Sequence, residues 1–176
     1  MVTPDADAGG ANPFADPPDS RDPIRRFRGR IAGGVSIVTS GTGRDRAGLT
    51  VSSLMVAEGE PGLVYLLVGS TSDLFGQLEL TGRFVVHICA GKQRELAEVF
   101  AGLRPSPGGT FAGRAVSQSE YGDILDDIGT RAYCSVVAMR EESYSVLVSG
   151  AIDRVEAGGE SRDPLLFHRG AYGRLA

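Results

Sequence analysis

Short runs of β-branched and aliphatic residues recur along most of the chain and limit what it can fold into. VSIVT at 35–39, LVYLLV at 63–68 and FVVHIC at 84–89 have the composition of β-strands. CSVVAM at 134–139 and YSVLVSGAI at 144–152 add two more. These runs do not alternate regularly with helical segments, which argues against a doubly wound parallel sheet. We predict a mainly β fold, an antiparallel barrel of six or seven strands with a few short helices packed on its ends.

Two strand segments carry more detailed predictions. AGLTV at 47–51 follows VSIVT after the turn SGTGRDRAG, so the two segments are expected to form a hairpin. LVYLLV at 63–68 is continuously apolar, and this pattern favours a strand that is buried on both faces. PLLFH at 164–168 is a further strand candidate near the end of the chain.

Three segments have helical patterns. From Pro23, a suitable first-turn residue after a possible N-cap at Asp22, Ile24, Phe27 and Ile31 follow the spacing of an amphipathic helix. STSDLFGQLEL at 70–80 opens with hydroxyls and an acid, as helices often do, and KQRELAEVFAGL at 92–103 carries an apolar stripe. Prolines and a glycine pair make residues 104–130 irregular in this prediction.

The chain of 176 residues is long enough for one domain of ordinary size. Residues 1–22 are rich in Pro, Asp, Ala and Gly, and this composition predicts a disordered N-terminal tail. An arm that packs across a partner subunit through Phe14 is the alternative. Residues 23–176 are expected to form the single folded domain.

Several classes of function lose support from the composition. The net charge of −4 does not favour nucleic acid as a partner, and the arginines at 25, 26, 28 and 30 are interpreted as a solvated helix face. Two cysteines without a CxxC motif or a His/Cys cluster predict no metal site, but buried reduced thiols. No apolar stretch approaches the ~20 residues that span a membrane, and no signal-peptide pattern is present, so a cytoplasmic protein without a membrane partner is expected.

The usual nucleotide and nucleophile motifs do not occur in the sequence. A phosphate-binding loop, a dinucleotide fingerprint followed by a helix and a G-x-S-x-G nucleophile elbow are all missing. The kinase, classical dehydrogenase and hydrolase classes therefore lack their normal sequence support.

Two clusters of hydroxyl side chains flank the apolar run at 63–68. Hydroxyls and free backbone N–H groups at strand ends and helix N-termini can hold a phosphate or the edge of a heterocycle. The same residue types are also common in turns and helix caps, so spacing alone leaves both interpretations open. The six residues are Thr50, Ser52, Ser53, Ser70, Thr71 and Ser72.

The order of several short motifs from about Gly34 to Tyr172 resembles the short-chain flavin reductases, whose fold is an FMN-binding split barrel. GLTVSSL at 48–54 is similar to the "G-x-T-x-S-S" segment of that family. Further matches are GVSIVTS (34–40), PGLV (61–64), TSDLFGQLELTGRFVVHIC (71–89), KQRELAEVFAG (92–102), SGAIDRV (149–155) and DPLLFHRGAYGRL (163–175).

This resemblance implies a homodimer that binds FMN or FAD near the subunit interface and reduces it with NADH or NADPH. It also implies a partner monooxygenase that receives the reduced flavin. No catalytic acid or base is implied, because the cofactors carry the chemistry. The implied flavin-binding residues are Thr50, Ser52 and Ser53 at the ring and ribityl chain, Ser70, Thr71 and Ser72 at the phosphate, Phe100, Ala101 and Gly102 bordering the flavin, and His168, Arg169 and Tyr172 in the closing segment.

Departures from the family pattern keep other functions open. Ser145 stands where the family often has a histidine near the nicotinamide, and the neighbouring Tyr144 is either a stacking residue or an ordinary strand aromatic. His87 replaces the usual asparagine and is interpreted as a hydrogen-bonded, partly buried histidine, while Glu58 is expected to face solvent. The alternatives are a barrel that holds FMN or a deazaflavin tightly and acts on another substrate, and a non-catalytic flavin-binding module.

Overall fold

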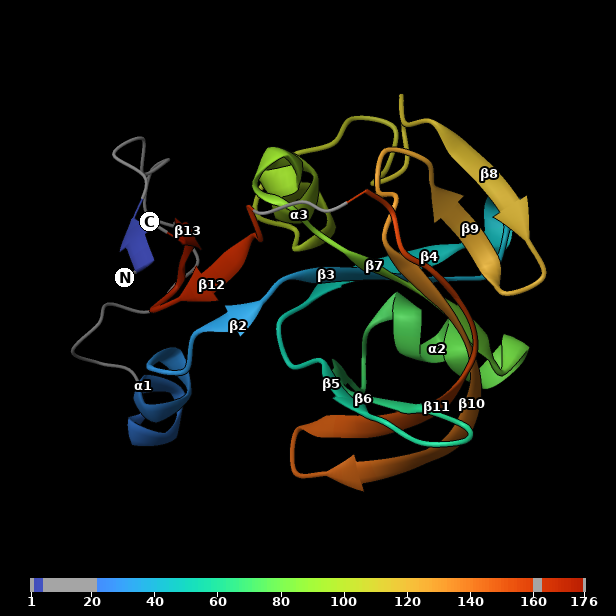
Figure 1. Ribbon diagram of the computed structural model, residues 1–176, viewed down its shortest axis with the longest axis horizontal. Coiled ribbons are helices and arrows are strands. Elements are labelled where there is room, and N and C mark those ends of the chain that lie inside the picture. Colours follow the sequence, from blue (N-terminus) through green and yellow to red (C-terminus); the bar gives the residue numbers. More distant parts are fainter. Residues whose placement is uncertain (1, 5–21, 160–162, 176) are drawn as a thin grey trace.

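The computed structural model describes residues 2–4, 22–159 and 163–175, and its main feature is a seven-stranded antiparallel sheet that curls into a barrel (Figure 1). The strand order is β4-β3-β7-β10-β11-β6-β5. The prediction of a mainly β antiparallel fold with short helices is therefore confirmed. The strands are β3 (Ser36–Ser40), β4 (Ala47–Val51), β5 (Met55–Ala57), β6 (Leu63–Gly69), β7 (Arg83–Ile88), β10 (Arg131–Glu142) and β11 (Ser145–Glu156).

The barrel interior is filled by alternate side chains of these strands. On β6, Val64, Leu66 and Val68 are buried in the core, whereas Leu67 between them is exposed. The prediction that 63–68 is buried on both faces was therefore wrong. A continuous apolar run does not distinguish a doubly buried strand from one whose outer face is apolar and open.

Three short helices complete the barrel: α1 (Pro23–Gly29), α2 (Asp73–Thr81) and α3 (Arg94–Phe100). Leu74 and Leu78 of α2 belong to the barrel core, and Gly82, with a φ of 63°, ends this helix in the left-handed conformation. Short 3₁₀ turns, Gly43–Asp45 and Gly91–Gln93, precede β4 and α3. No helix in the described part of the chain is long and apolar enough to cross a membrane.

A smaller sheet lies beside the barrel in the order β1-β13-β12-β2 (Figure 1). Its first strand falls in the segment for which a disordered tail was predicted, while residues 5–21 lie outside the described residues. A second core cluster joins this sheet to α3 and β3, with Val35, Phe100 and Tyr172 among its buried members. The strands are β1 (Val2–Pro4), β2 (Gly33–Gly34), β12 (Leu166–His168) and β13 (Ala171–Leu175).

Helix α1 lies apart from the barrel (Figure 1). Ile24, Phe27 and Ile31 are 75%, 72% and 61% exposed, and no residue of the helix is buried. The amphipathic spacing in the sequence thus gives a helix whose apolar stripe has no partner within the described residues. Asp22 caps the helix as predicted, by accepting a hydrogen bond from the Ile24 N–H at 2.8 Å.

The prediction of irregular structure over 104–130 was wrong for part of that segment. Strands β8 (Val116–Ser119) and β9 (Gly122–Leu125) form a small hairpin. Its sequence is polar and lacks β-branched runs, so the local signal is weak. Contacts from β3 and the residue after it hold the hairpin in place. The Thr39 hydroxyl donates to the Asp123 carbonyl at 2.6 Å, and the Asp123 N–H donates to the Gly41 carbonyl at 3.0 Å.

His87 is completely buried between three strands, which confirms the prediction of a hydrogen-bonded histidine. Its Nδ1 lies 3.1 Å from the Ile37 carbonyl on β3, and its Nε2 accepts from the Leu125 N–H on β9 at 3.1 Å. Both contacts are satisfied by a neutral ring that carries its proton on Nδ1. Burial, the largest effect, lowers the pKa of His87 to about 4.

Both cysteines are buried and free, as predicted from the sequence. Burial raises the pKa of the Cys89 thiol and of the Cys134 thiol to about 12. These thiols are therefore protonated at neutral pH, and they behave as packed apolar groups rather than nucleophiles or ligands. Among the described residues no group of three His, Cys, Asp or Glu side chains is arranged to hold a metal ion.

Candidate functional site

The two hydroxyl segments meet at one edge of the barrel because Ser53 spans from the end of β4 to β6. The Ser53 Oγ accepts a hydrogen bond from the Leu67 N–H at 3.0 Å. Strand β6 ends two residues later at Gly69, and Ser70 and Thr71 follow in exposed positions. Strands β4 and β5–β6 lie at opposite ends of the sheet order, so this contact is made where the curled sheet nearly closes.

Three of the six predicted hydroxyls are available to a ligand and three are engaged within the chain. Ser52, Ser70 and Thr71 are exposed, and their side chains form no hydrogen bond with another described residue. In contrast, Thr50 Oγ1 donates to the Ala97 carbonyl of α3 at 2.7 Å. The engaged hydroxyls position the backbone, and the exposed ones provide the donors and acceptors.

Ser72 fixes the start of α2 beside these exposed hydroxyls. Its Oγ accepts from the Phe75 N–H at 3.2 Å and donates to the Gly69 carbonyl at 2.8 Å. The N-terminal end of a helix favours an anion through its free N–H groups, although the Asp73 carboxylate in the first turn opposes one. Besides the helix end, the exposed hydroxyls of Ser70 and Thr71 are the neutral hydrogen-bonding groups here.

The C-terminal part of α3 packs directly against β4. A Cβ added to Gly48 would lie 2.5 Å from Cε1 of Phe100, so the glycine allows this close approach. The Phe100 ring is buried and meets Phe111 edge to face at 4.9 Å. Ala101 caps the helix, and the exposed Gly102 follows with a φ of 70°. Of the three predicted residues here, only Gly102 faces solvent fully.

The closing segment reaches the same place through the short strand β2. Gly33 pairs with Phe167 of β12, and a Cβ on Gly33 would lie 2.8 Å from the Ser52 carbonyl oxygen. His168 is half-buried, and Arg169 is exposed in the turn that follows, with a φ of 53°. The Arg169 N–H donates to the Gly29 carbonyl at 2.8 Å, which ties this turn to α1.

Tyr172 supports this segment from inside the second core. It is buried, and its ring contacts Phe167 at a centroid distance of 5.3 Å. Burial, with a smaller effect of the Glu98 charge, raises the pKa of its phenol. A buried neutral phenol is suited to packing, so a direct contact between Tyr172 and a ligand stays a prediction.

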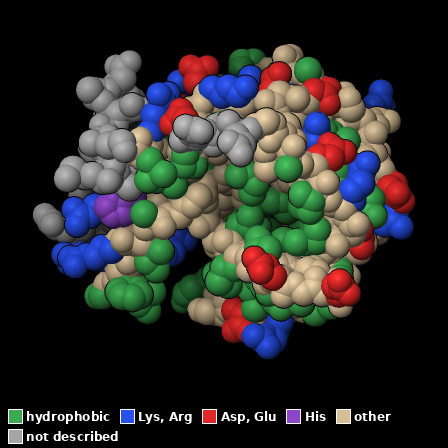
Figure 2. Space-filling model, in the orientation of Figure 1, with side chains coloured by type: hydrophobic (Ala, Val, Ile, Leu, Met, Phe, Trp, Pro, Cys, Tyr) green, Lys and Arg blue, Asp and Glu red, His purple; other side chains and the backbone are tan. Residues whose placement is uncertain are grey.

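The structure brings Thr50, Ser52 and Ser53 into contact with α3, β2 and β6, and the two close glycine contacts were not revealed by the sequence. Gly48 was interpreted as part of a strand, and a signal was present there, since glycine in a strand often marks a close approach of other groups. Figure 2 shows hydrophobic side chains around a hollow in the middle of the viewed face. Exposed apolar side chains near the hydroxyls are Met55, Val56 and Leu67.

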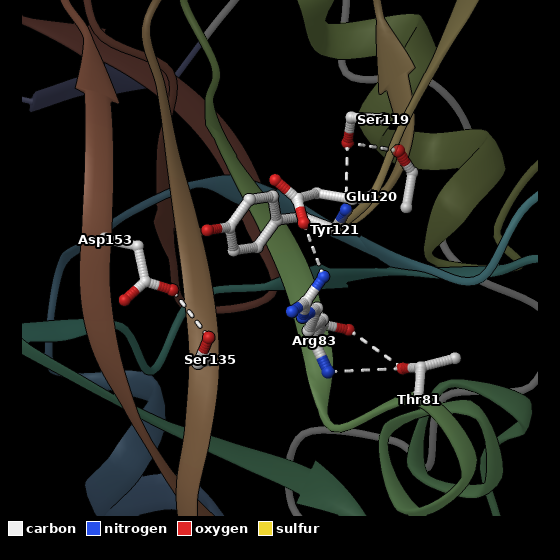
Figure 3. Close-up of polar contacts among 8 residues, drawn as sticks. Thr81, Arg83, Ser119, Glu120, Tyr121, Ser135 and Asp153 are labelled. Atoms are coloured by element: carbon white, nitrogen blue, oxygen red, sulfur yellow. Dashed lines mark hydrogen bonds and ion pairs between the residues drawn. The ribbon is translucent and has the colours of Figure 1, made fainter.

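A cavity of about 340 Å³ lies at the other end of the β3–β4 hairpin, between the turn at 41–45, α2 and the β8–β9 turn. Two of its lining residues bind Arg83 (Figure 3): the Arg83 guanidinium lies 2.6 Å from the Glu120 carboxylate, and the Thr81 hydroxyl accepts from the Arg83 N–H at 3.2 Å. Figure 3 also shows the Tyr121 hydroxyl directed toward the strand of Asp153. This cluster ties the β8–β9 turn to β7 and is separate from the hydroxyl edge.

A family model described as "Flavin reductase like domain" matches residues 28–176. The chain belongs to this flavin reductase family. The resemblance stated from the motifs is therefore confirmed over almost the whole described barrel.

Named relatives of this flavin reductase domain are oxidoreductases. It is 30% identical over 159 residues to "NADH-dependent FMN reductase AsuE2" of Streptomyces nodosus subsp. asukaensis, covering 88% of this chain and 85% of the relative. It is 29% identical over 152 residues to the reductase subunit HsaB of a flavin-dependent monooxygenase of Mycobacterium tuberculosis, covering 85% and 79%.

Solved structures confirm the split-barrel fold of the flavin reductase family. Nitrilotriacetate monooxygenase component B from Mycobacterium thermoresistibile superposes with a TM-score of 0.77 at 28% identity, over 87% of this chain and 85% of that one. The NADH:FAD oxidoreductase SgcE6 of Streptomyces globisporus, solved in complex with NAD and FAD fragments, superposes with a TM-score of 0.78 at 22% identity. The superposition covers 92% of this chain and 96% of that one. At that identity the second structure supports the fold alone.

The hydroxyl edge of this flavin reductase fits a flavin chemically. Flavin phosphates need hydroxyl and N–H donors, which Ser70, Thr71 and the start of α2 provide. The isoalloxazine ring needs an apolar surface with polar groups at its edge, and the exposed Met55 and Ser52 can supply these. The glycine at 33 keeps the backbone of Ser52 in place without a side chain in between.

Proposed function

We propose that this protein is a flavin reductase that uses NADH to reduce FMN or FAD. The observation that carries the proposal is the Ser53–Leu67 hydrogen bond, which brings two exposed hydroxyl segments to one edge of a family-defining barrel. The relative AsuE2 is named as an NADH-dependent FMN reductase, and FAD is the alternative flavin. NADPH is the alternative hydride donor.

Each part of the edge has a proposed role. Ser70 and Thr71 bind the phosphate, and Ser52 binds the polar edge of the ring. Ser53, Thr50 and Phe100 act through the backbone, because they fix the segment that carries Ser52 to β6 and α3. His168 and Arg169 border the site on the side of β2, where a nicotinamide nucleotide would enter.

The bound flavin supplies the ring that accepts the hydride, so the chain's own contribution is orientation. Two rings must be held in contact, at a fixed distance and angle, for a hydride to transfer. A surface of short side chains and strand backbone suits this task, since it holds a flat ring with little loss of side-chain freedom. No acid or base from the chain is required.

We propose a homodimer as the active assembly. The apolar stripe of α1, which is exposed on its own, would be covered by a second copy, because a seven-residue helix without packing is not stable in water. Four arginines surround this stripe, and the barrel edge of the second copy offers the exposed Val56 beside two carboxylates. The arginines are Arg25, Arg26, Arg28 and Arg30, and the carboxylates are Glu58 and Glu60.

The dimer can be tested with one substitution. Phe27→Asp places a charge in the middle of the stripe, and we expect the mass in solution, measured by light scattering, to change from two chains to one. Arg44→Asp, on the remote 3₁₀ turn, is the control and keeps the dimer. A wild-type mass of one chain would contradict the proposal.

The reduced flavin is proposed to leave for a partner flavin-dependent monooxygenase, as the name of the relative HsaB indicates for its own system. Exposed rather than enclosed hydroxyls are consistent with a flavin that binds and leaves. Two buried, unpaired cysteines are consistent with a reducing compartment, so we place the reaction in the cytoplasm.

Steady-state oxidation of NADH or NADPH, each crossed with FMN and FAD, tests the function. We expect nicotinamide oxidation that rises with added flavin and reaches a plateau. No turnover with any of the four pairs would refute the proposal. A purified protein that stays yellow after dialysis, and does not respond to added flavin, would instead support the tightly bound flavin of the alternative function.

A further inference from the structure

Tyr144 is the most exposed large apolar side chain reported for the described residues, at 95%, and it stands at the tip of the β10–β11 hairpin. Figure 1 shows this hairpin at the lower edge of the barrel. The turn consists of Ser143 and Tyr144, with Ser143 at a φ of 57°. Turns of this kind favour glycine or asparagine, so the turn itself gives no reason for a tyrosine.

The register of the sheet places this tip beside the phosphate segment. Ser145 of β11 pairs with Gly69, the last residue of β6. Tyr144 and Ser70 are the next residues along each chain from this pair, at the point where the β6 chain turns, since the Ser72 N–H donates to the Gly69 carbonyl at 3.1 Å. An exposed aromatic residue and the exposed hydroxyls of Ser70 and Thr71 therefore leave the sheet at the same end of the β6–β11 pair.

We infer that Tyr144 stacks on the adenine ring of FAD and makes this protein prefer FAD to FMN. The inference rests on the proposed function, which places the flavin phosphate at Ser70 and Thr71. FAD differs from FMN by an adenylate joined to that phosphate, so the adenylate extends past the phosphate segment. The hairpin tip is the neighbouring element there, and a planar base stacks well on a tyrosine ring.

One of the two carboxylates next to the tip is compensated by a neighbouring arginine. Glu142 is paired with Arg140, whose Nε lies 2.6 Å from the Glu142 carboxylate, so its charge is largely compensated. Glu141 pairs in register with Val146, whose side chain is buried in the barrel, and so projects to the opposite face from Ser145. By the same alternation this is the face of Tyr144, so the Glu141 carboxylate is the one charge of the tip that opposes a second phosphate there.

Binding of FMN and FAD, measured by isothermal titration calorimetry on the full-length chain, tests the inference. Tyr144→Ala is expected to weaken FAD binding about tenfold, as stacking contacts do on truncation, while the Kd for FMN stays within about twofold. Tyr144→Phe keeps the ring and is expected to keep the FAD affinity. Leu80→Ala, an exposed residue on α2, is the matched control and should change neither Kd.

Three outcomes would overturn the inference. One is an unchanged Kd for FAD in Tyr144→Ala, and another is an equal loss for FMN and FAD. The third is an increase in the KM for NADH, with FMN as acceptor, because the ring would then hold the adenosine of the nicotinamide nucleotide. These results are distinct from a failure of the proposed function, which would appear as wild-type protein that neither binds nor reduces FMN or FAD.

Discussion

Gly33 lies against the backbone of Ser52, so close that a Cβ on Gly33 would be 2.8 Å from the Ser52 carbonyl oxygen. This contact joins the small sheet to the end of β4, because Gly33 also pairs with Phe167 of β12. The position of Ser52, a proposed flavin contact, thus depends on the absence of a side chain in a different sheet.

Substitution of this glycine should affect the site more than the fold. Gly33→Ala is expected to displace the Ser52 segment and weaken FMN binding about fivefold to tenfold, measured by quenching of flavin fluorescence. The neighbouring Gly34→Ala is the control, since a Cβ there would meet nothing within 4 Å. Equal flavin affinities for the two variants would show that the contact does not position Ser52.

Removal of the hydroxyl that joins β4 to β6 should weaken both stability and binding. Ser53→Ala leaves the Leu67 N–H without its partner, so the free energy of unfolding is expected to fall by ~1 kcal/mol. Urea denaturation measures this change in the free energy of unfolding, and flavin titration measures the accompanying loss of flavin affinity. Ser117→Ala, exposed on β8, is the control. A stable Ser53→Ala protein with unchanged flavin affinity would contradict the role given to this hydrogen bond.

The phosphate assignment can be tested by comparing two flavins. Ser70→Ala and Thr71→Ala remove hydroxyls that form no hydrogen bond within the described chain, so the fold should tolerate both changes. We expect each to weaken FMN binding several-fold and to leave riboflavin, which has no phosphate, unaffected. The ratio of the two dissociation constants is the measurement. An equal loss of affinity for FMN and riboflavin would show that Ser70 and Thr71 do not bind the phosphate.

Acid stability should depend on His87. Its pKa is lowered to about 4 by burial, whereas the unfolded chain takes up the proton near 6.5. Between these values the unfolded state binds a proton that the native state does not, so the free energy of unfolding decreases as the pH falls. The gap corresponds to ~3 kcal/mol, fully lost below pH 4.

His87→Asn should remove this pH dependence while it lowers stability at pH 7, because it disturbs the hydrogen bonds to Ile37 and Leu125. The measurement is urea unfolding at intervals from pH 7 to pH 4, compared with His168→Asn as a control for the half-buried histidine. The carboxylates titrate in both proteins, so the difference between them isolates His87. The same slope in wild type and His87→Asn would refute the prediction.

The strands could be predicted because their local composition and their tertiary environment agree. VSIVT and FVVHIC are strand formers and are also buried in the barrel as β3 and β7. In the β8–β9 hairpin the local composition does not favour strands, and hydrogen bonds to Thr39 and Gly41 hold the hairpin in place instead. Local propensity cannot report a contact made across more than 80 residues.

The candidate site was predictable as a set of residues but not as an arrangement. Strand alternation shows which hydroxyls share a face, yet which of them a ligand can reach depends on partners such as Ala97 and Leu67. Tyr172 illustrates the same limit, because its motif position suggests a ligand contact while the second core buries it. That Tyr144 and Ser70 leave the sheet at the same end follows from the pairing of Ser145 with Gly69, which no local pattern contains.

The central claim is that this barrel edge holds a flavin in a position to accept a hydride from NADH. Anaerobic mixing of protein, FMN and one equivalent of NADH tests it directly, with flavin absorbance as the readout. The account predicts that the flavin is bleached in step with NADH oxidation, much faster than without protein, and that Ser70→Ala slows bleaching at low FMN. Bleaching at the rate of the protein-free mixture would contradict it.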